Sequence, residues 1–105
     1  MRPGQTALFA IALCGFAAVP AQAATVDVVM AKLAVKPAQV TAKVGDTIRW
    51  DNKDFVAHTA TAAGGAFDVM LPAGKSGSVV VTKAGTFDYI CKFHPNMKGR
   101  VTVTP

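Results

Sequence analysis

Short runs of alternating apolar and polar residues follow one another from Ala24 to Pro105, and they limit the folds open to this chain. Valine and threonine, which favour strands, supply 22 of these 82 residues. No segment has the 3.6-residue apolar period and the capping residues of a long helix. Turn signals such as Gly45-Asp46 and Ala84-Gly85 separate the runs, which is typical of a small all-β sandwich or barrel. The expected strands are 25–32, 39–44, 47–52, 59–63, 76–82, 86–91 and 100–104, and 64–74 is expected to be irregular with a short helical turn.

The first 23 residues differ in composition from the rest of the chain. Arg2 is followed by an apolar run, Ala7–Val19, and then by Ala21-Gln22-Ala23, which fits the A-x-A pattern of a signal-peptide cleavage site. The run of 13 residues is shorter than the roughly 20 that a membrane-spanning helix needs. The sequence therefore predicts a signal peptide over 1–23, one domain over 24–105, and a periplasmic protein that is not integral to the membrane. An uncleaved N-terminal anchor is the alternative.

Cysteine usage restricts the chemistry. Cys14 would leave with the signal peptide, so the exported chain keeps Cys91 alone and has no internal disulfide. A free thiol in an oxidising compartment is a core residue, a reactive group or a metal ligand.

Cys91 begins a cluster of metal-capable side chains. It stands in the pattern C-x2-H-x2-M with His94 and Met97, and the only other histidine, His58, lies 33 residues before the cysteine. Both histidines belong to segments that break the strand pattern, and loops at one end of a sandwich lie side by side. Two imidazoles, one thiolate and a weak axial thioether are the donor set of a blue-copper electron-transfer centre.

Other interpretations use the same residues. Cys91 and Met97 can be packing residues, and His58 can be a hydrogen-bonded core histidine. A periplasmic copper-binding, delivery or resistance protein would use the same donors, although such sites are usually rich in methionine. A thiol enzyme built on Cys91 and His94 lacks an evident orienting third group, and thioether is a poor ligand for zinc.

Two motifs resemble the cupredoxins, most closely their amicyanin-like members with a short ligand loop. One runs from Ala84-Gly85-Thr86 through Cys91 to Gly99, and the other is Gly45–Trp50 followed by Asn52 and His58. The resemblance implies a Greek-key β-sandwich holding one type 1 copper ion, with His58, Cys91 and His94 as equatorial ligands and Met97 as the axial ligand. It also implies an electron carrier and not an enzyme. Amicyanins take electrons from a quinoprotein amine dehydrogenase and pass them to a c-type cytochrome, so transient redox partners of these kinds and a monomeric state are expected.

The chain departs from the family pattern beside the first histidine. Members often have Pro before this histidine and Asn after it, where this chain has Ala57 and Thr59. The Asn ties the first ligand loop to the cysteine loop. We hypothesise that the Thr59 hydroxyl does part of this work, and the alternative is a strand threonine chosen for its β propensity.

Charge and apolar residues suggest how partners are met. The basic residues of 24–105 exceed the acidic ones by 4, but they do not interleave with aromatics, so no nucleic-acid binding is expected. Lys92, Lys98 and Arg100 are expected to form a rim facing an acidic partner. By resemblance the ring edge of His94 is the electron port, and Pro95, Phe93, Met70 and Pro72 are candidates for an apolar patch around it.

Overall fold

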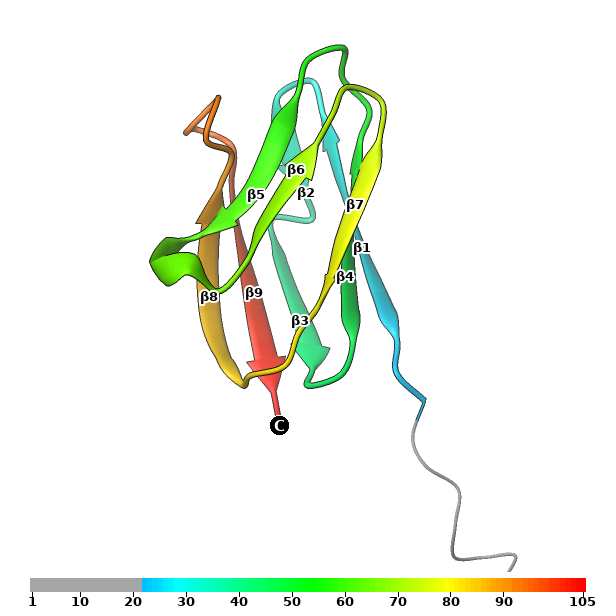
Figure 1. The fold of residues 1–105 in the computed structure, drawn as a ribbon, viewed down its shortest axis with the longest axis vertical. Helices are drawn as coiled ribbons and strands as arrows, with labels where there is room; N and C mark the ends of the chain where they lie inside the picture. Colours follow the sequence, from blue (N-terminus) through cyan, green and yellow to red (C-terminus); the bar gives the residue numbers. More distant parts are fainter. Residues whose placement is uncertain (1–21) are drawn as a thin grey trace, which may run out of the picture.

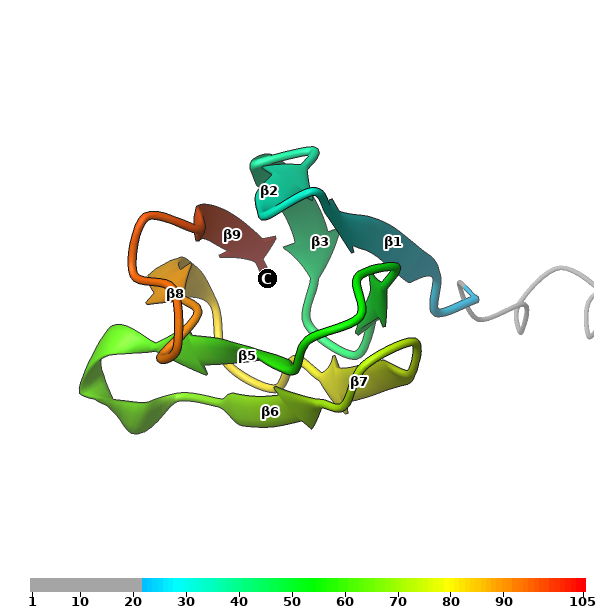
Figure 2. The same cartoon turned by 90° about the horizontal axis from the view of Figure 1, so that it is seen from above.

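The chain folds into two β-sheets that face each other, and the predicted all-β sandwich is confirmed (Figure 1). The computed structural model describes residues 22–105, so nearly all of the predicted signal peptide lies outside the described residues. One sheet has the order β2 (Ala34–Lys36), β1 (Thr25–Ala31), β4 (Thr47–Asn52) and β7 (Ser76–Val80). The other has the order β3 (Gln39–Lys43), β9 (Lys98–Thr104), β8 (Gly85–Ile90), β5 (His58–Ala62) and β6 (Asp68–Leu71). Figure 2, which looks at the sandwich from above, shows the two sheets on either side of a common interior.

All seven predicted strands are present with boundaries that differ by at most two residues, and the structure adds two more. β6 lies inside the stretch expected to be irregular, after a 3-10 turn, η1 (Ala63–Gly65). Its four residues pair antiparallel with β5, from His58 opposite Leu71 to Thr61 opposite Asp68. β2 has three residues and pairs with β1. Both strands are too short for their own pattern to reveal them, and pairing with a neighbour makes them strands.

The core lies between the sheets and holds the aromatic side chains of Trp50, Phe67 and Tyr89. Trp50 of β4 is fully buried, with its ring 5.5 Å from the rings of both Phe67 and Tyr89. The Tyr89 ring of β8 covers Gly99 of β9, where any side chain would collide with it. This contact holds together the two strands whose connecting loop carries Cys91 and His94.

The loops that carry the metal-capable residues meet at one end of the sandwich. The β4–β5 loop and the β8–β9 loop both lie at the upper end in Figure 1, whereas the β3–β4 turn and the start of β1 lie at the lower end. Among residues 22–105, the structure contains no helix with the length and apolar character needed to cross a membrane.

Candidate metal centre

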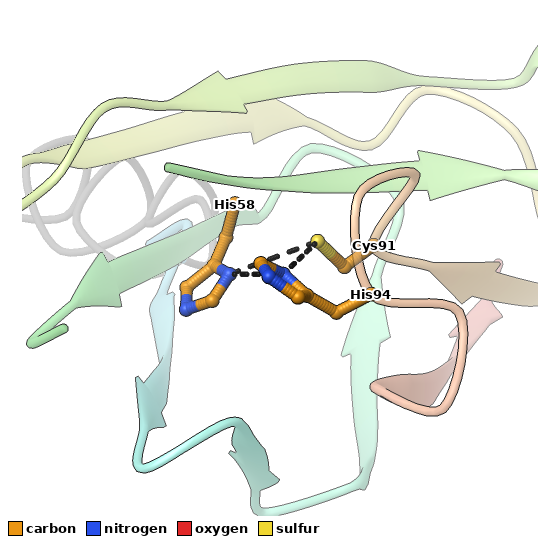
Figure 3. A group of neighbouring side chains, drawn as sticks. All are labelled: His58, Cys91 and His94. Atoms are coloured by element: carbon orange, nitrogen blue, oxygen red, sulfur yellow. Dashed lines mark hydrogen bonds between the residues drawn. The ribbon is translucent and has the colours of Figure 1, made fainter. Parts of the chain in front are cut away.

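Three of the four predicted ligand residues converge at the upper end of the sandwich (Figure 3). His58 is the first residue of β5, Cys91 directly follows β8, and His94 lies in the β8–β9 loop. The Nδ1 atoms of the two histidines are 3.2 Å apart. The Cys91 Sγ lies 3.7 Å from His58 Nδ1 and 3.6 Å from His94 Nδ1.

The triangle of donor atoms has the size that a metal ion requires. A point equidistant from the three atoms lies about 2.0 Å from each, close to the 2.0–2.3 Å bonds that zinc makes to imidazole and thiolate. One thiolate and two imidazoles are soft and borderline donors, which suit copper better than Mg²⁺ or Ca²⁺. The residues present therefore fit a copper ion.

Local hydrogen bonds close the β8–β9 loop around the cysteine. The His94 N–H donates to the Cys91 carbonyl at 3.2 Å, and the Met97 N–H donates to the His94 carbonyl at 2.8 Å. The Cys91 N–H donates to the Met97 carbonyl at 3.0 Å. Met97, the fourth predicted ligand, is buried at the end of this closed loop.

Asp54 orients the first histidine, and the sequence analysis did not identify it. Its Oδ2 lies 2.8 Å from His58 Nε2, so the ring donates its Nε2 proton outward and presents the Nδ1 lone pair to the site. The same carboxylate accepts the N–H groups of Lys32 and Leu33 at 2.6 and 3.1 Å. The hydrogen bond from His58, followed by that from Leu33, lowers the pKa of Asp54. Asp54 therefore links the ligand to the β1–β2 turn, whose residues Lys32 and Leu33 have positive φ angles of 54° and 59°.

Asn52 fixes the loop that carries Asp54. Its buried side chain donates to the carbonyls of Val56 and Leu71 at 2.9 and 3.0 Å and accepts the Asp54 N–H at 2.8 Å. The β4–β5 loop is thus held against the end of β6. The sequence marked Asn52 only as part of a family motif.

Thr59 connects the two ligand segments, as hypothesised for its hydroxyl. Its Oγ1 accepts the Lys92 N–H at 2.9 Å, and its own N–H lies 3.4 Å from the Cys91 Sγ. The Thr59 and Thr61 hydroxyls are 2.9 Å apart, and Thr61 donates to Asp68 at 2.8 Å. The Lys92 ammonium also donates to Asp68, at 2.8 Å. This hydrogen bond, together with that from Thr61, lowers the pKa of Asp68. The sequence analysis expected a link from Thr59 to the cysteine loop, and the structure shows hydrogen bonds that continue from Thr59 through Thr61 to Asp68.

Burial separates the three converging residues. His58 and Cys91 are fully buried, whereas His94 is partly exposed. The four predicted patch residues Phe93, Pro95, Met70 and Pro72 are all exposed, with Phe93 at 53%. The loops at this end also expose three apolar side chains that the sequence analysis did not select, namely Leu33, Phe55 and Val56, and Phe55 is fully exposed.

Two of the three residues of the predicted basic rim form ion pairs with acidic neighbours, which lowers the net charge of the rim. Lys92 pairs with Asp68 at 2.8 Å, and Arg100 pairs with Asp88 at 2.7 Å. Within residues 22–105, only Lys98 of the three rim residues forms no ion pair. Asp68 and Asp88 lie far from these basic residues in sequence, so a scan along the chain could not pair them.

Comparison with known proteins gives a consistent result. A family model described as a cupredoxin-like domain matches residues 4–103. The chain is 34% identical to amicyanin-alpha of Methylorubrum extorquens, over 90% of this chain and 95% of the relative, and 32% identical to amicyanin of Paracoccus denitrificans, over 84% and 72%. The crystal structure of amicyanin from Paracoccus versutus superposes with a TM-score of 0.66 at 33% identity, covering 83% of this chain and 86% of that one.

Proposed function

Because the chain belongs to the cupredoxin family and resembles its amicyanin members, we propose that it is a blue-copper electron carrier that holds one copper ion through His58, Cys91, His94 and Met97. The observation that carries the proposal is the convergence of the Cys91 thiol and two imidazole Nδ1 atoms on one point. Copper bound there supplies one-electron chemistry between Cu(II) and Cu(I). No bond to a substrate is made or broken, so the protein acts as a carrier and not as an enzyme.

The residues around the ligands keep the site in one shape. Asp54 fixes the tautomer and ring orientation of His58, and the Thr59 N–H points to the Cys91 sulfur, where it stabilises negative charge. Burial of His58 and Cys91 keeps water away from the thiolate. A site held in this way rearranges little when its charge changes, which favours fast electron transfer. Met97, the buried thioether of the same loop, would be the fourth residue to hold the ion.

His94 is the proposed route for the electron. It is the most exposed of the three converging residues, and its loop neighbours Phe93 and Pro95 are exposed apolar residues. Phe55, Val56 and Met70 add apolar surface at the same end. Such a surface suits a small and transient contact with a redox protein. We propose a quinoprotein dehydrogenase as donor and a c-type cytochrome as acceptor, with this protein a monomer.

The proposed location is the periplasm, reached through removal of residues 1–23. The support is the leader pattern of the sequence, which ends at Ala23, and the ordered strand β1, which begins two residues later at Thr25. A copper-delivery role would need a cluster of accessible methionines. Among the described residues Met30 is buried in the core, so it cannot join Met70 at the surface.

An absorption spectrum of the purified protein after addition of Cu(II), before and after ascorbate, tests the function. We expect an intense visible band from thiolate-to-copper charge transfer that bleaches on reduction and returns on oxidation. Cys91→Ser removes the thiolate and should abolish the band, while Thr41→Ser, on the exposed face of β3, should retain it. A colourless or weakly absorbing protein would contradict the carrier proposal.

A further inference from the structure

Asp46 is a buried carboxylate on which the Lys43 ammonium acts electrostatically from beyond ion-pair distance. It lies in the β3–β4 turn at the lower end of the sandwich in Figure 1, away from the candidate metal centre, and it is only 8% exposed. No Lys, Arg or His side chain of residues 22–105 forms an ion pair with it. Buried carboxylates are ordinarily paired with a positive charge, so this residue requires an explanation.

Backbone hydrogen bonds hold the Asp46 carboxylate in one position. Oδ2 accepts the Lys43 N–H at 2.8 Å, and Oδ1 accepts the Ala24 N–H at 2.9 Å. The Asp46 main chain is also fixed, because its N–H donates to the Lys43 carbonyl and its carbonyl accepts the Val81 N–H, each at 2.9 Å. The carboxylate is therefore a rigid acceptor directed at the nitrogen of Ala24.

Ala24 is held at the same place by a second bond. Its carbonyl accepts the Thr47 N–H at 2.9 Å, and the parallel pairing of β1 with β4 begins at the next residue, with Thr25 opposite Thr47. The position of the Ala24 nitrogen is thus set by sheet register and by the carboxylate together.

We propose that Asp46 is the binding site for the α-ammonium group that processing creates at Ala24. Hydrolysis of the Ala23–Ala24 peptide bond by a signal peptidase consumes one water and leaves a carboxylate on Ala23 and an ammonium on Ala24. The hydrogen bond from a neutral amide N–H to the Asp46 carboxylate then becomes an ion pair, in which donor and acceptor are both charged. The new chain terminus is then the cation in direct contact with the Asp46 carboxylate. This inference rests on the proposed export and processing of the chain.

The geometry selects one cleavage position. An extended chain advances about 3.3 Å per residue, so a cut after Ala21 or after Ala24 would place the ammonium beyond hydrogen-bond reach of Asp46. Only a cut after Ala23 puts the charge on the nitrogen that already lies 2.9 Å from the carboxylate.

The first test is the intact mass of the protein recovered after expression of the full chain, residues 1–105, with export to the periplasm. We expect a chain that begins at Ala24. A chain that begins at Gln22 or Thr25 would overturn this inference while leaving export and electron transfer standing. A chain that keeps its leader would contradict the proposed processing, and the copper spectrum would still report separately on function.

The second test measures whether the terminus and Asp46 interact. Urea unfolding is compared for the form that begins at Ala24 and a form that begins at Gln22, each with and without Asp46→Asn. With Asp46 present, we expect an unfolding constant about threefold smaller for the Ala24 form, a size typical of a partly exposed ion pair. With Asp46→Asn the two forms should be equally stable. Asp27→Asn, which removes a carboxylate from β1 itself, is the matched control and should leave the threefold ratio unchanged.

Salt dependence keeps the test decisive if Asp46→Asn does not fold. In the protein with Asp46 intact, the unfolding constants of the forms that begin at Gln22 and at Ala24 are compared again in 1 M NaCl. Their ratio should fall toward one, because salt screens a partly exposed ion pair. A ratio that does not change with salt, or one that survives Asp46→Asn, would overturn the proposal.

Discussion

Replacement of Thr59 by valine tests whether its hydroxyl holds the two ligand segments together. Valine has nearly the same shape and keeps the backbone N–H that lies 3.4 Å from the Cys91 sulfur. It removes only the oxygen that accepts the Lys92 N–H at 2.9 Å and that lies 2.9 Å from the Thr61 hydroxyl. The change therefore isolates one hydroxyl in a side chain that is 2% exposed.

The expected cost follows from the groups left without partners. A buried donor that loses its acceptor costs about 1–3 kcal/mol, and the Lys92 N–H is only partly buried, so the lower half of that range applies. We expect the free energy of unfolding to fall by about 1–2 kcal/mol. For a domain of this size, each kcal/mol lowers the melting temperature by roughly 4–8 °C.

Urea and thermal unfolding of the metal-free protein measure this loss without a contribution from copper. Thr41→Val, at an exposed position of β3, is the control and should change stability by less than about 0.5 kcal/mol. If Thr59→Val changes stability by no more than this control does, the hydroxyl does not hold the segments together.

Three further predictions follow from the structure. Thr59→Asn should shift the reduction potential of the copper-loaded protein, because it alters the hydrogen bonding beside the cysteine; voltammetry showing an unchanged potential would contradict this. Gly99→Ala should destabilise the fold by at least about 1–3 kcal/mol in urea unfolding, since the new Cβ would collide with the Tyr89 ring, and wild-type stability would count against that packing. Hydrogen bonds from the Ala24 and Lys43 N–H groups hold the pKa of Asp46 below its ordinary value of 3.8. Its contribution to stability is therefore present above pH 3.8 and is lost as pH falls through the lower pKa of the folded state, and Asp46→Asn should flatten the loss of stability measured between pH 4 and pH 2.

The candidate metal centre could be read from the sequence because its chemistry is local. Cys91, His94 and Met97 lie in one short loop, where C-x2-H-x2-M spacing brings them together whatever the rest of the chain does. His58 was identified because it is the only histidine of the chain besides His94. Of the residues that hold these groups in place, the sequence analysis identified Thr59 but not Asp54 or Thr61. Asp54 and Thr61 are common residue types whose role depends on which atoms they meet.

The surface residues were likewise predicted from the sequence only in part. The exposed apolar residues Phe93 and Met70 were expected from the resemblance to the family. Phe55 was not expected, because an exposed phenylalanine cannot be told from a core phenylalanine by its type alone. The sequence analysis assigned no acidic partner to Lys92 or Arg100, yet Lys92 pairs with Asp68 of β6 and Arg100 pairs with Asp88 of the neighbouring strand β8.

From the sequence we could infer the all-β class, seven of the nine strands found in residues 22–105, and the donor set of the metal centre. These depend on alternation along each strand and on spacing within one loop, which act over a few residues. Three contacts became visible in the folded chain alone: β6 pairs with β5, Asp54 orients His58, and Asp46 accepts the N–H of Ala24. Sheet register determines the first and last of these contacts, and the packing of the β4–β5 loop determines the second. No local pattern specifies which strands become neighbours, because that choice depends on the free energy of burying one shared core.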